Sequence, residues 1–261
     1  MRIMSHSMSD PCSHTHHMIV RTHYELGQTA LRIICDERYL PIVKDAVHSA
    51  RSIIENKIAE DPFFGTTFEP YSPLKDDHQL VQHMCQASVL SNVGPMAGVA
   101  GAIAKYAVDA AIENGCDHII IDNGGDICMR TSETTIIGVF SGDDKFKDIA
   151  FSIPPTDRVF SICSSSGKVG PSVSFGNSGI CTVFSNDPVL ADCCATAFGN
   201  MIREGTSEEM SQASEDIASI DDISGCVCVS NGLIAMCGDI PEMVRVSSTE
   251  SDVTKILFPH I

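Results

Sequence analysis

Apolar side chains recur at intervals of three and four residues along several stretches of the chain, a spacing that places them on one face of a helix. Residues 40–60 show it most clearly, from Ile42 to Ile58. The same spacing predicts further helices over residues 77–91, 96–114 and 188–202. Asn186 or Asp187 is suited to cap the last of these, because a side-chain oxygen at that position accepts from the first free amides.

Short apolar runs bounded by turn residues predict β-strands between these helices. The runs cover residues 31–35, 118–122, 127–130, 135–140, 157–163 and 180–185. Residues 226–230 and 233–237 flank Asn231 and Gly232, which predicts a hairpin. Long helices thus lie between groups of strands that look antiparallel, and no repeat of 20–50 residues is apparent. We therefore expect an α+β fold with helices packed on one face of an antiparallel sheet.

Two segments do not fit this pattern. Residues 1–20 are rich in His and Ser without apolar periodicity, so we expect a disordered tail followed by a single domain over residues 21–261. His14, His16 and His17 in that tail could bind a metal, but a solvated tail is the simpler interpretation. Residues 205–222 are rich in acids and are expected to form a solvated helical arm or mobile insertion rather than an interaction tail.

Charge and composition narrow the class of protein. The 261 residues carry 34 acids against 17 Lys and Arg, a formal net charge of −17, which argues against a nucleic-acid partner. The longest mostly apolar stretch, residues 93–108, is shorter than a bilayer requires, and the first 18 residues lack the apolar core of a signal peptide. We therefore expect a cytoplasmic protein away from membranes whose 12 cysteines are reduced thiols. A monomer and a homo-oligomer both stay open.

The first candidate site is the turn formed by Asn123, Gly124, Gly125 and Asp126, which follows a predicted buried strand. Paired glycines let the backbone approach a bulky ligand, and the flanking polar side chains can bind it or close the turn. The same four residues also make an ordinary β-turn. The chain has no P-loop and no G-x-G-x-x-G fingerprint.

The second candidate is the pair Asp192 and Thr196, which the predicted helix over residues 188–202 places one turn apart on one face. A carboxylate and a hydroxyl are hard oxygen ligands that suit Mg²⁺. The alternative is a solvated Asp and a Thr bonded within its own helix.

Two further segments carry possible chemistry. Residues 164–170 follow a predicted strand, and Ser166 and Gly167 there could bind a phosphate or belong to an ordinary polar loop. The adjacent Cys193 and Cys194 are most simply buried thiols, since neighbours on a helix cannot easily share a metal.

The order of three motifs resembles that of ApbE-type FAD:protein FMN transferases. They are GAIAKYAVD at 101–109, NGGDI at 123–127 and DCCATA at 192–197, where the transferases have a glycine-rich helix, an N-A-G-G-D-I turn and a D-x-x-x-T helix. The wider match, which adds residues 93–97, 164–170 and 174–176, is more similar to the ApbE-like uncharacterised protein family 0280.

This resemblance implies a T-fold-like sheet and a cleft for a flavin or adenine nucleotide such as FAD. It implies that Asp192 and Thr196, with a backbone oxygen near Ala104, bind Mg²⁺ beside the FAD pyrophosphate. Gly124, Gly125 and Asp126 would lie at the ligand, as would Asn123.

Two departures from the transferases bear on activity. Residues 170–176 read GPSVSFG where the transferases have a His-containing H-x-I-D-P-R-T-G segment, and the chain lacks their lipobox or signal. We therefore expect no FMN transfer to a standard Thr acceptor, because a base must activate the hydroxyl.

Two other functions stay open. Members of the resembling family in methanogenic archaea are associated with sulfide assimilation toward homocysteine, which would need an exposed thiolate of lowered pKa; Cys193 or Cys194, near a helix start, is then the first choice. The other alternative is a non-catalytic flavin-binding or scaffold subunit.

Overall fold

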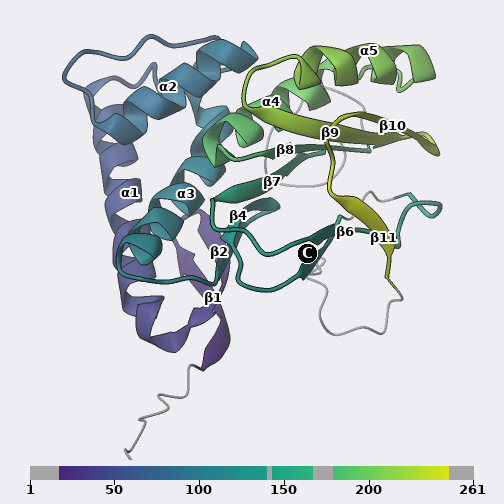
Figure 1. Cartoon of the computed structure of the whole chain (residues 1–261). Coiled ribbons are helices and arrows are strands. Elements are labelled where there is room, and N and C mark those ends of the chain that lie inside the picture. Colours follow the sequence, from purple (N-terminus) through teal and green to yellow (C-terminus); the bar gives the residue numbers. More distant parts are fainter. Residues whose placement is uncertain (1–17, 140–142, 167–178, 247–261) are drawn as a thin grey trace, which may run out of the picture.

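Antiparallel pairing of mostly buried strands builds the centre of the molecule. The computed structural model describes residues 18–139, 143–166 and 179–246. Within them, eight strands form one sheet in the order β1-β2-β3-β4-β7-β8-β9-β10, with every neighbouring pair antiparallel (Figure 1). The strands are β1 Ile19–Leu26, β2 Thr29–Asp36, β3 Ile119–Asn123, β4 Asp126–Arg130, β7 Phe160–Ser165, β8 Ile180–Ser185, β9 Ile223–Ser230 and β10 Leu233–Gly238.

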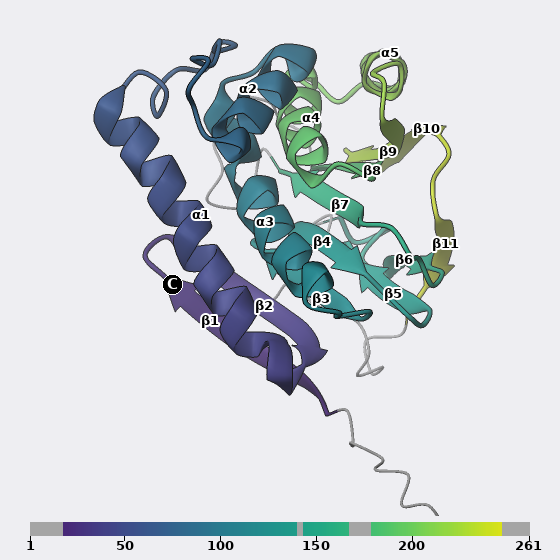
Figure 2. The same cartoon turned by 60° about the vertical axis from the view of Figure 1, so that its left-hand side comes forward.

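The helices cover one face of this sheet (Figure 2). They are η1 Glu37–Tyr39, α1 Leu40–Glu60, α2 Gln79–Ser91, η2 Pro95–Gly98, α3 Val99–Glu113, α4 Pro188–Met201 and α5 Ser207–Ala218. The inward side chains of α1, such as Val43, Val47 and Ala50, are fully buried against the same core as Ile33 and Ile121 of the sheet. Apolar periodicity along the helices and alternation along the strands thus meet in one core.

A second, smaller sheet packs on the opposite face. It has three strands in the order β11-β6-β5: β5 Thr135–Gly138, β6 Ile149–Ile153 and β11 Glu242–Arg245. Phe151 of β6 meets Phe184 of β8 edge to face, with ring centroids 4.9 Å apart. Ile127 and Ile162 of the large sheet belong to this second apolar cluster. The large sheet is therefore buried on both faces, which explains the unbroken apolar runs of its central strands.

The predicted α+β class, with helices on one face of an antiparallel sheet, is confirmed. The predicted helices over 40–60, 77–91 and 188–202 are present within two residues at each end. Strand β1 was not predicted and begins at Ile19, inside the stretch assigned to the tail. It lies at the edge of the sheet, so its side chains alternate only between exposed and half-buried and its sequence carries little apolar signal.

The acidic segment 205–222 forms a helix, as the prediction of a solvated helical arm included, but the prediction that it is a solvated arm or a mobile insertion was wrong. It contains α5, which packs on β9 and buries Met210, Ala213 and Ile217. The carboxylate of Glu209 accepts hydrogen bonds from the amides of residues 203, 204 and 205, and Thr206 caps the helix. Part of the acidic charge therefore satisfies the start of a packed helix.

The described cysteines form no disulfide: eleven are free thiols, and ten of these are buried. Within the same residues no single helix is long and apolar enough to cross a membrane, although α2 taken together with the segment Pro95–Glu113 passes that test as a bent pair.

Helices α3 and α4 touch through glycine. A Cβ atom added at Gly101 would stand 2.2 Å from the carbonyl oxygen of Pro188, and one added at Gly98 would stand 2.7 Å from Sγ of Cys193. Real Cβ contacts are never this short, so only glycine permits this separation of the two helices. The contact sets the distance across which the first turns of α3 and α4 face each other.

We expect Gly101→Ala to lower the free energy of unfolding by about 1–3 kcal/mol, the usual cost of overpacking, although alanine has the higher helix propensity. Urea denaturation followed by circular dichroism measures the change. Glu113→Ala, at the exposed end of the same helix, is the control and should stay within about 0.5 kcal/mol of the parent. Equal stability of both variants would mean that the two helices can separate without cost.

Candidate functional site

The turn between β3 and β4 requires glycine for its backbone conformation. Gly124 has φ +72° and Gly125 has φ +111°, both in the region that L side chains rarely adopt. The carboxylate of Asp122 accepts a hydrogen bond from the amide of Gly125 at 3.0 Å, which closes the turn. A Cβ added at Gly124 would meet nothing within 4 Å, so its exposed backbone faces open space.

Asn123 ties this turn to the helix layer. Its side-chain amide donates to the carbonyl oxygen of Ala100, in the first turn of α3, at 3.1 Å. The apolar face that β3 turns to the helices carries Ile119 and Ile121, so alternation places Asn123 on that same face. The predicted turn residues therefore lie at the start of α3 rather than on the outer side of the sheet.

Asp192 faces the same point from α4. Its carboxylate accepts a hydrogen bond from the amide of Gly101 at 2.8 Å, and the residue is only 7% exposed. The alternative of a solvated Asp is therefore wrong. Burial raises the pKa of Asp192 to about 7, although hydrogen bonds from the amides of Gly101 and Ala100 act in the opposite direction.

Asp126 is the second acid of this site. It opens β4 on the helix-facing side and accepts a hydrogen bond from the amide of Ser164 at 3.3 Å. Burial and the negative charge of Asp192 raise the pKa of Asp126 well above the usual range, and the charge of Asp122 raises it further. The hydrogen bond from the Ser164 amide acts in the opposite direction. Ionisation of both carboxylates in one poorly solvated region is unfavourable, which favours a shared proton or a bound cation.

The remaining predicted metal ligands, Thr196 and Ala104, lie on α4 and α3. Thr196 is half-buried on α4, one turn after Asp192. Ala104 is fully buried in α3, and the groups of α3 that take part in the site's hydrogen bonds are the carbonyl of Ala100 and the amide of Gly101. The role in Mg²⁺ binding that the resemblance implies for a backbone oxygen near Ala104 stays a prediction.

Of the predicted phosphate-binding residues after β7, one can be placed. The hydroxyl of Ser166 donates to the carbonyl oxygen of Gly179 at 2.7 Å, across the two ends of segment 167–178. Gly167 lies outside the described residues. The hydroxyl of Ser165, at the end of β7, is buried and has no hydrogen-bond partner.

Cys193 and Cys194 do not have the surroundings of a reactive thiolate. Both are fully buried, and Cys193 packs against Gly98. Burial raises the pKa of Cys194 to about 12, and burial together with the charge of Asp192 raises that of Cys193 well above its ordinary value. The structure gives no support to either as a sulfur carrier, which needs exposure and a lowered pKa.

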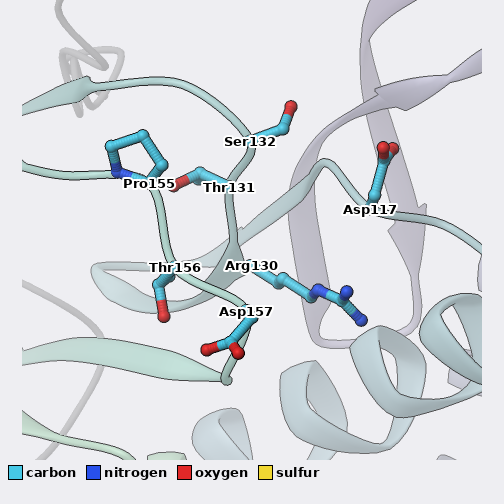
Figure 3. Close-up of a pocket in the computed structure, with 7 residues that line it drawn as sticks. All are labelled: Asp117, Arg130, Thr131, Ser132, Pro155, Thr156 and Asp157. Carbon is cyan, nitrogen blue, oxygen red and sulfur yellow. The ribbon is translucent and has the colours of Figure 1, made fainter.

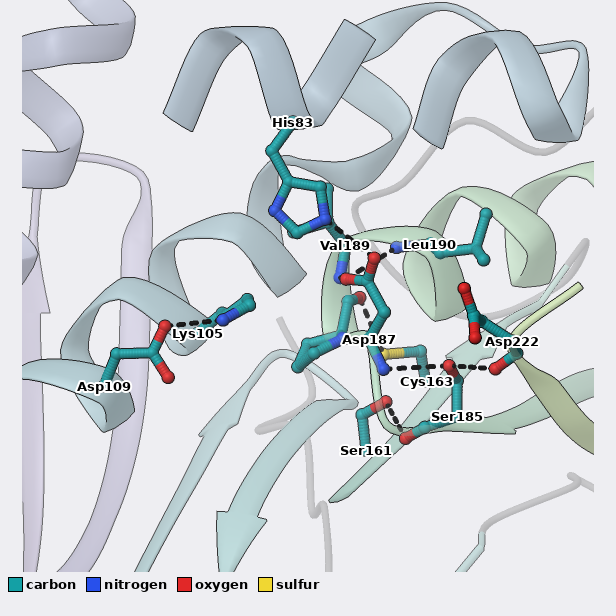
Figure 4. A network of polar contacts seen from close by, with 11 residues as sticks. His83, Lys105, Asp109, Ser161, Cys163, Ser185, Asp187, Val189, Leu190 and Asp222 are labelled. Atoms are coloured by element: carbon teal, nitrogen blue, oxygen red, sulfur yellow. Dashed lines mark hydrogen bonds and ion pairs between the residues drawn. The ribbon is translucent and has the colours of Figure 1, made fainter. Parts of the chain in front are cut away.

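Sequence reasoning missed a polar network below the start of α4 (Figure 4). Nε2 of His83, on α2, lies 2.7 Å from the carboxylate of Asp187, which caps α4 by accepting from the amides of residues 189 and 190. Burial opposes ionisation of Asp187, but His83 and these amides hold its pKa below the usual range. The sequence indicated Asp187 as a cap; nothing local indicated His83, which is 104 residues away.

Cys163 connects this network to the acids. Its thiol donates to the carbonyl oxygen of Pro188 at 3.6 Å (Figure 4). The same side chain also contacts the carboxylate of Asp126, at the start of the neighbouring strand β4. The carbonyl oxygen of Pro188 is also the atom that a side chain at position 101 would clash with, so it can lie there only because residue 101 is glycine. The start of α4, the start of α3 and the end of β7 are thus held together around Asp126 and Asp192.

An open pocket of about 490 Å³ lies elsewhere (Figure 3). Arg130, Asp117, Thr156 and Asp157 are among its lining residues. Arg130 ends β4, whereas Asp126 begins it, so roughly 13 Å of strand separates the pocket from the acids. We therefore treat the pocket and the carboxylate site as separate.

The donor set limits which metal could be held. Among the described residues, no three His, Cys, Asp or Glu side chains converge as a metal centre. Two carboxylates without a third do fit Mg²⁺, which typically takes one or two protein carboxylates and completes its shell with water and ligand phosphates.

A family model and sequence relatives both match most of the chain. A family model described as AbpE bacteria matches residues 12–230. A UPF0280 protein of Methanocella arvoryzae is 38% identical over 232 residues, covering 89% of this chain and 94% of the relative. One of Methanothrix thermoacetophila is 37% identical over 239 residues, covering 91% and 100%.

Solved structures share the fold at much lower identity. The flavin transferase ApbE from Vibrio cholerae superposes with a TM-score of 0.58 at 10% identity, covering 85% of this chain and 97% of that one. The flavinyl transferase ApbE of Pseudomonas stutzeri gives a TM-score of 0.56 at 10% identity, covering 85% and 94%. The predicted resemblance to ApbE proteins is confirmed at the level of the fold, while the narrower T-fold assignment stays a prediction.

The raised pKa of Asp192 predicts how the free energy of unfolding depends on pH. In the unfolded chain its pKa is about 4, so between about pH 4 and 7 the folded state binds the proton more tightly and loses stability as the pH rises. Asp192→Asn keeps an acceptor for Gly101 without this loss. In EDTA, we expect the variant's stability relative to the parent to improve by on the order of 1–3 kcal/mol from pH 4.5 to pH 7.5.

Urea denaturation at several pH values measures this difference. Asp45→Asn, an exposed acid on α1, is the matched control and should show no such trend. A difference between Asp192→Asn and the parent that is independent of pH would contradict the raised pKa.

Proposed function

Because this chain belongs to the family of UPF0280 proteins, which is ApbE-like, we propose that Asp126, Asp192 and the turn at Gly124 bind FAD together with Mg²⁺. The choice of a flavin as ligand rests on the structural neighbours, which are named as a flavin transferase and a flavinyl transferase. The choice of residues rests on the contacts within this chain.

The single observation that carries the proposal is that two acids, Asp126 at the start of β4 and Asp192 on α4, meet beside the first turn of α3, where each accepts a hydrogen bond from a backbone amide and their charges interact. Burial and mutual repulsion make the ionised form of Asp126 and Asp192 unfavourable, and a divalent cation between them would relieve both effects. Both carboxylates would then bind the ion directly, with the half-buried hydroxyl of Thr196 as a further ligand from the next turn of α4. When bound, Mg²⁺ neutralises diphosphate charge and polarises the phosphoryl group.

The overall charge supports the same conclusion. A chain of net charge −17 that places two acids in its site repels a dinucleotide diphosphate unless a cation intervenes. Asp126 and Asp192 accept hydrogen bonds from backbone amides, while Arg32 lies opposite Asp122 on β2 and favours the ionised form of that acid. Binding of FAD should therefore depend on the metal strongly rather than marginally.

The turn between β3 and β4 would position the nucleotide. The amide of Gly125 is already bonded to Asp122, whereas the exposed backbone of Gly124 faces open space. Asn123 holds the turn against α3 through Ala100, so the turn has a fixed position relative to Asp192. A turn that is already rigid can position the ligand without losing conformational entropy of its own on binding.

FMN transfer would be a further step beyond binding. The acceptor hydroxyl would attack the FMN phosphorus, AMP would leave, and the hydroxyl proton would pass to a base. The segment in which the transferases carry their His corresponds to residues 170–176, which lack His and lie outside the described residues. We propose that the chain binds FAD without flavinylating a Thr acceptor.

No observation favours sulfur transfer as a second function. It would require an exposed thiolate of lowered pKa, and the two candidate cysteines, Cys193 and Cys194, are buried with raised pKa values, as is Cys163 beside Asp126. A flavin-binding subunit without catalysis stays compatible with the binding proposal.

We expect calorimetric titration with FAD to show binding in Mg²⁺ that weakens at least ten-fold in EDTA. Asp126→Asn and Asp192→Asn should bind FAD weakly in both conditions, because an amide keeps the hydrogen-bond acceptor but loses the charge that holds the metal. Asp45→Asn, with the same loss of charge on exposed α1, should behave as the parent. Equal affinity with and without EDTA would exclude the metal role.

Transfer is tested separately. We expect an acceptor peptide containing Thr to gain no FMN mass after incubation with the protein, FAD and Mg²⁺, as followed by intact-mass spectrometry. An ApbE transferase run in parallel is the positive control. A modified peptide would show that this chain has a base other than the transferase His.

A further inference from the structure

Four cysteines lie on one side of three neighbouring strands. Cys181 of β8, Cys226 and Cys228 of β9 and Cys237 of β10 all contribute to the apolar cluster between the large sheet and the helices. In the strand registers Cys181 lies directly opposite Cys228, and Cys226 lies directly opposite Cys237. The sheet therefore presents two cross-strand pairs of thiols.

The inner pair is already in contact. Sγ of Cys181 and Sγ of Cys228 are 3.5 Å apart, and both residues are fully buried. Directly opposed residues of antiparallel strands have Cα atoms about 4.5–5.5 Å apart, which lies within the range that a disulfide spans. Closing the remaining gap to about 2 Å requires side-chain movement only.

The other cysteines near this pair are less well placed to form a bond. The thiol of Cys226 donates to the carbonyl of Ser214 on α5 at 3.3 Å, which directs it toward the helix. Cys237 is partly exposed on the edge strand. Cys193 and Cys194 are consecutive in α4, where neighbouring side chains point apart.

We propose that Cys181 and Cys228 are a buried dithiol that a small peroxide oxidises to a cross-strand disulfide; unlike a sulfur carrier, this pair needs no exposed thiolate to meet a bulky substrate, because the second sulfur is already in contact with the first. One thiol loses its proton, its thiolate sulfur attacks a peroxide oxygen, the O–O bond breaks, and the departing hydroxide takes up that proton, so that a sulfenic acid and one water form. The second thiol sulfur then displaces the hydroxyl group, the S–S bond forms, and a second water leaves. The two sulfurs lose two electrons in total and one peroxide molecule is reduced to two waters.

Burial limits which oxidants can react with this dithiol. Neither sulfur is exposed, so a bulky disulfide such as oxidised glutathione cannot reach the sulfur that it must contact, whereas a peroxide of about the size of water needs only a local opening of the strands. The bond would join β8 to β9 and close a loop that contains α4 and α5. Cross-links of this kind stabilise mainly by restricting the unfolded chain.

The experiment counts thiols in the folded protein after brief treatment with hydrogen peroxide. The chain has 12 cysteines, and after denaturation and alkylation we expect the count of labelled cysteines to fall from 12 to 10, with a peptide link between residues 181 and 228. Oxidised glutathione should leave 12 labelled cysteines, and dithiothreitol should restore 12 after peroxide. The melting temperature of the oxidised protein should rise by about 5 °C or more.

Variants separate this pair from general oxidation. Cys181→Ala and Cys228→Ala should each keep 11 labelled cysteines after peroxide. Cys85→Ala, which removes an equally buried thiol from α2, should fall from 11 to 9. A link mapped to Cys226 and Cys237 or to any other pair, or 12 labelled cysteines in the parent protein after peroxide, would overturn the proposal; this mapping does not depend on whether a variant folds.

Discussion

The hydrogen bond from the amide of Gly101 to the carboxylate of Asp192 is the interaction on which the candidate site depends. It exists only because α3 and α4 approach closely enough for Gly101 to touch the carbonyl of Pro188. That approach buries Asp192, and burial is what raises its pKa. Helix packing and the electrostatics of the site thus have one cause, a missing side chain in the first turn of α3.

The second acid adds an unfavourable term that the fold tolerates. Asp126 lies in the sheet beside Cys163 and shares its surroundings with Asp192, where the two charges repel. Proteins keep such pairs chiefly where function requires them, because apolar residues of the same size would be more stable. A cation bound between the acids converts this repulsion into attraction, which connects the cost in stability to the proposed function.

The cysteines divide into groups by location rather than by sequence. Cys193 and Cys194 attract notice as neighbours, yet each is separately buried in the core. Cys181 and Cys228 are 47 residues apart, yet their sulfurs touch because β8 and β9 pair with that register. Adjacency along a helix separates side chains, whereas opposition across two antiparallel strands brings them together.

The sequence by itself determined the elements whose signals are local. The spacing of apolar residues predicted α1, α2 and α4, the apolar run before Asn123 predicted β3, and the paired glycines predicted a tight turn. It also indicated Asp187 as a cap and placed Asp192 and Thr196 on one helical face. Edge strand β1 and packed helix α5 were missed or misassigned, because an exposed strand lacks apolar alternation and an acidic helix resembles a solvated one.

Only the tertiary structure decided which of these groups meet. Asp192 bonds to an amide 91 residues away, Asn123 to a carbonyl 23 residues away and His83 to a carboxylate 104 residues away. No local pattern encodes such partners, because they follow from the register of the strands and the separation of α3 and α4. Burial of an acid, and with it the rise in its pKa, is a property of that packing and not of the residue's neighbours in the sequence.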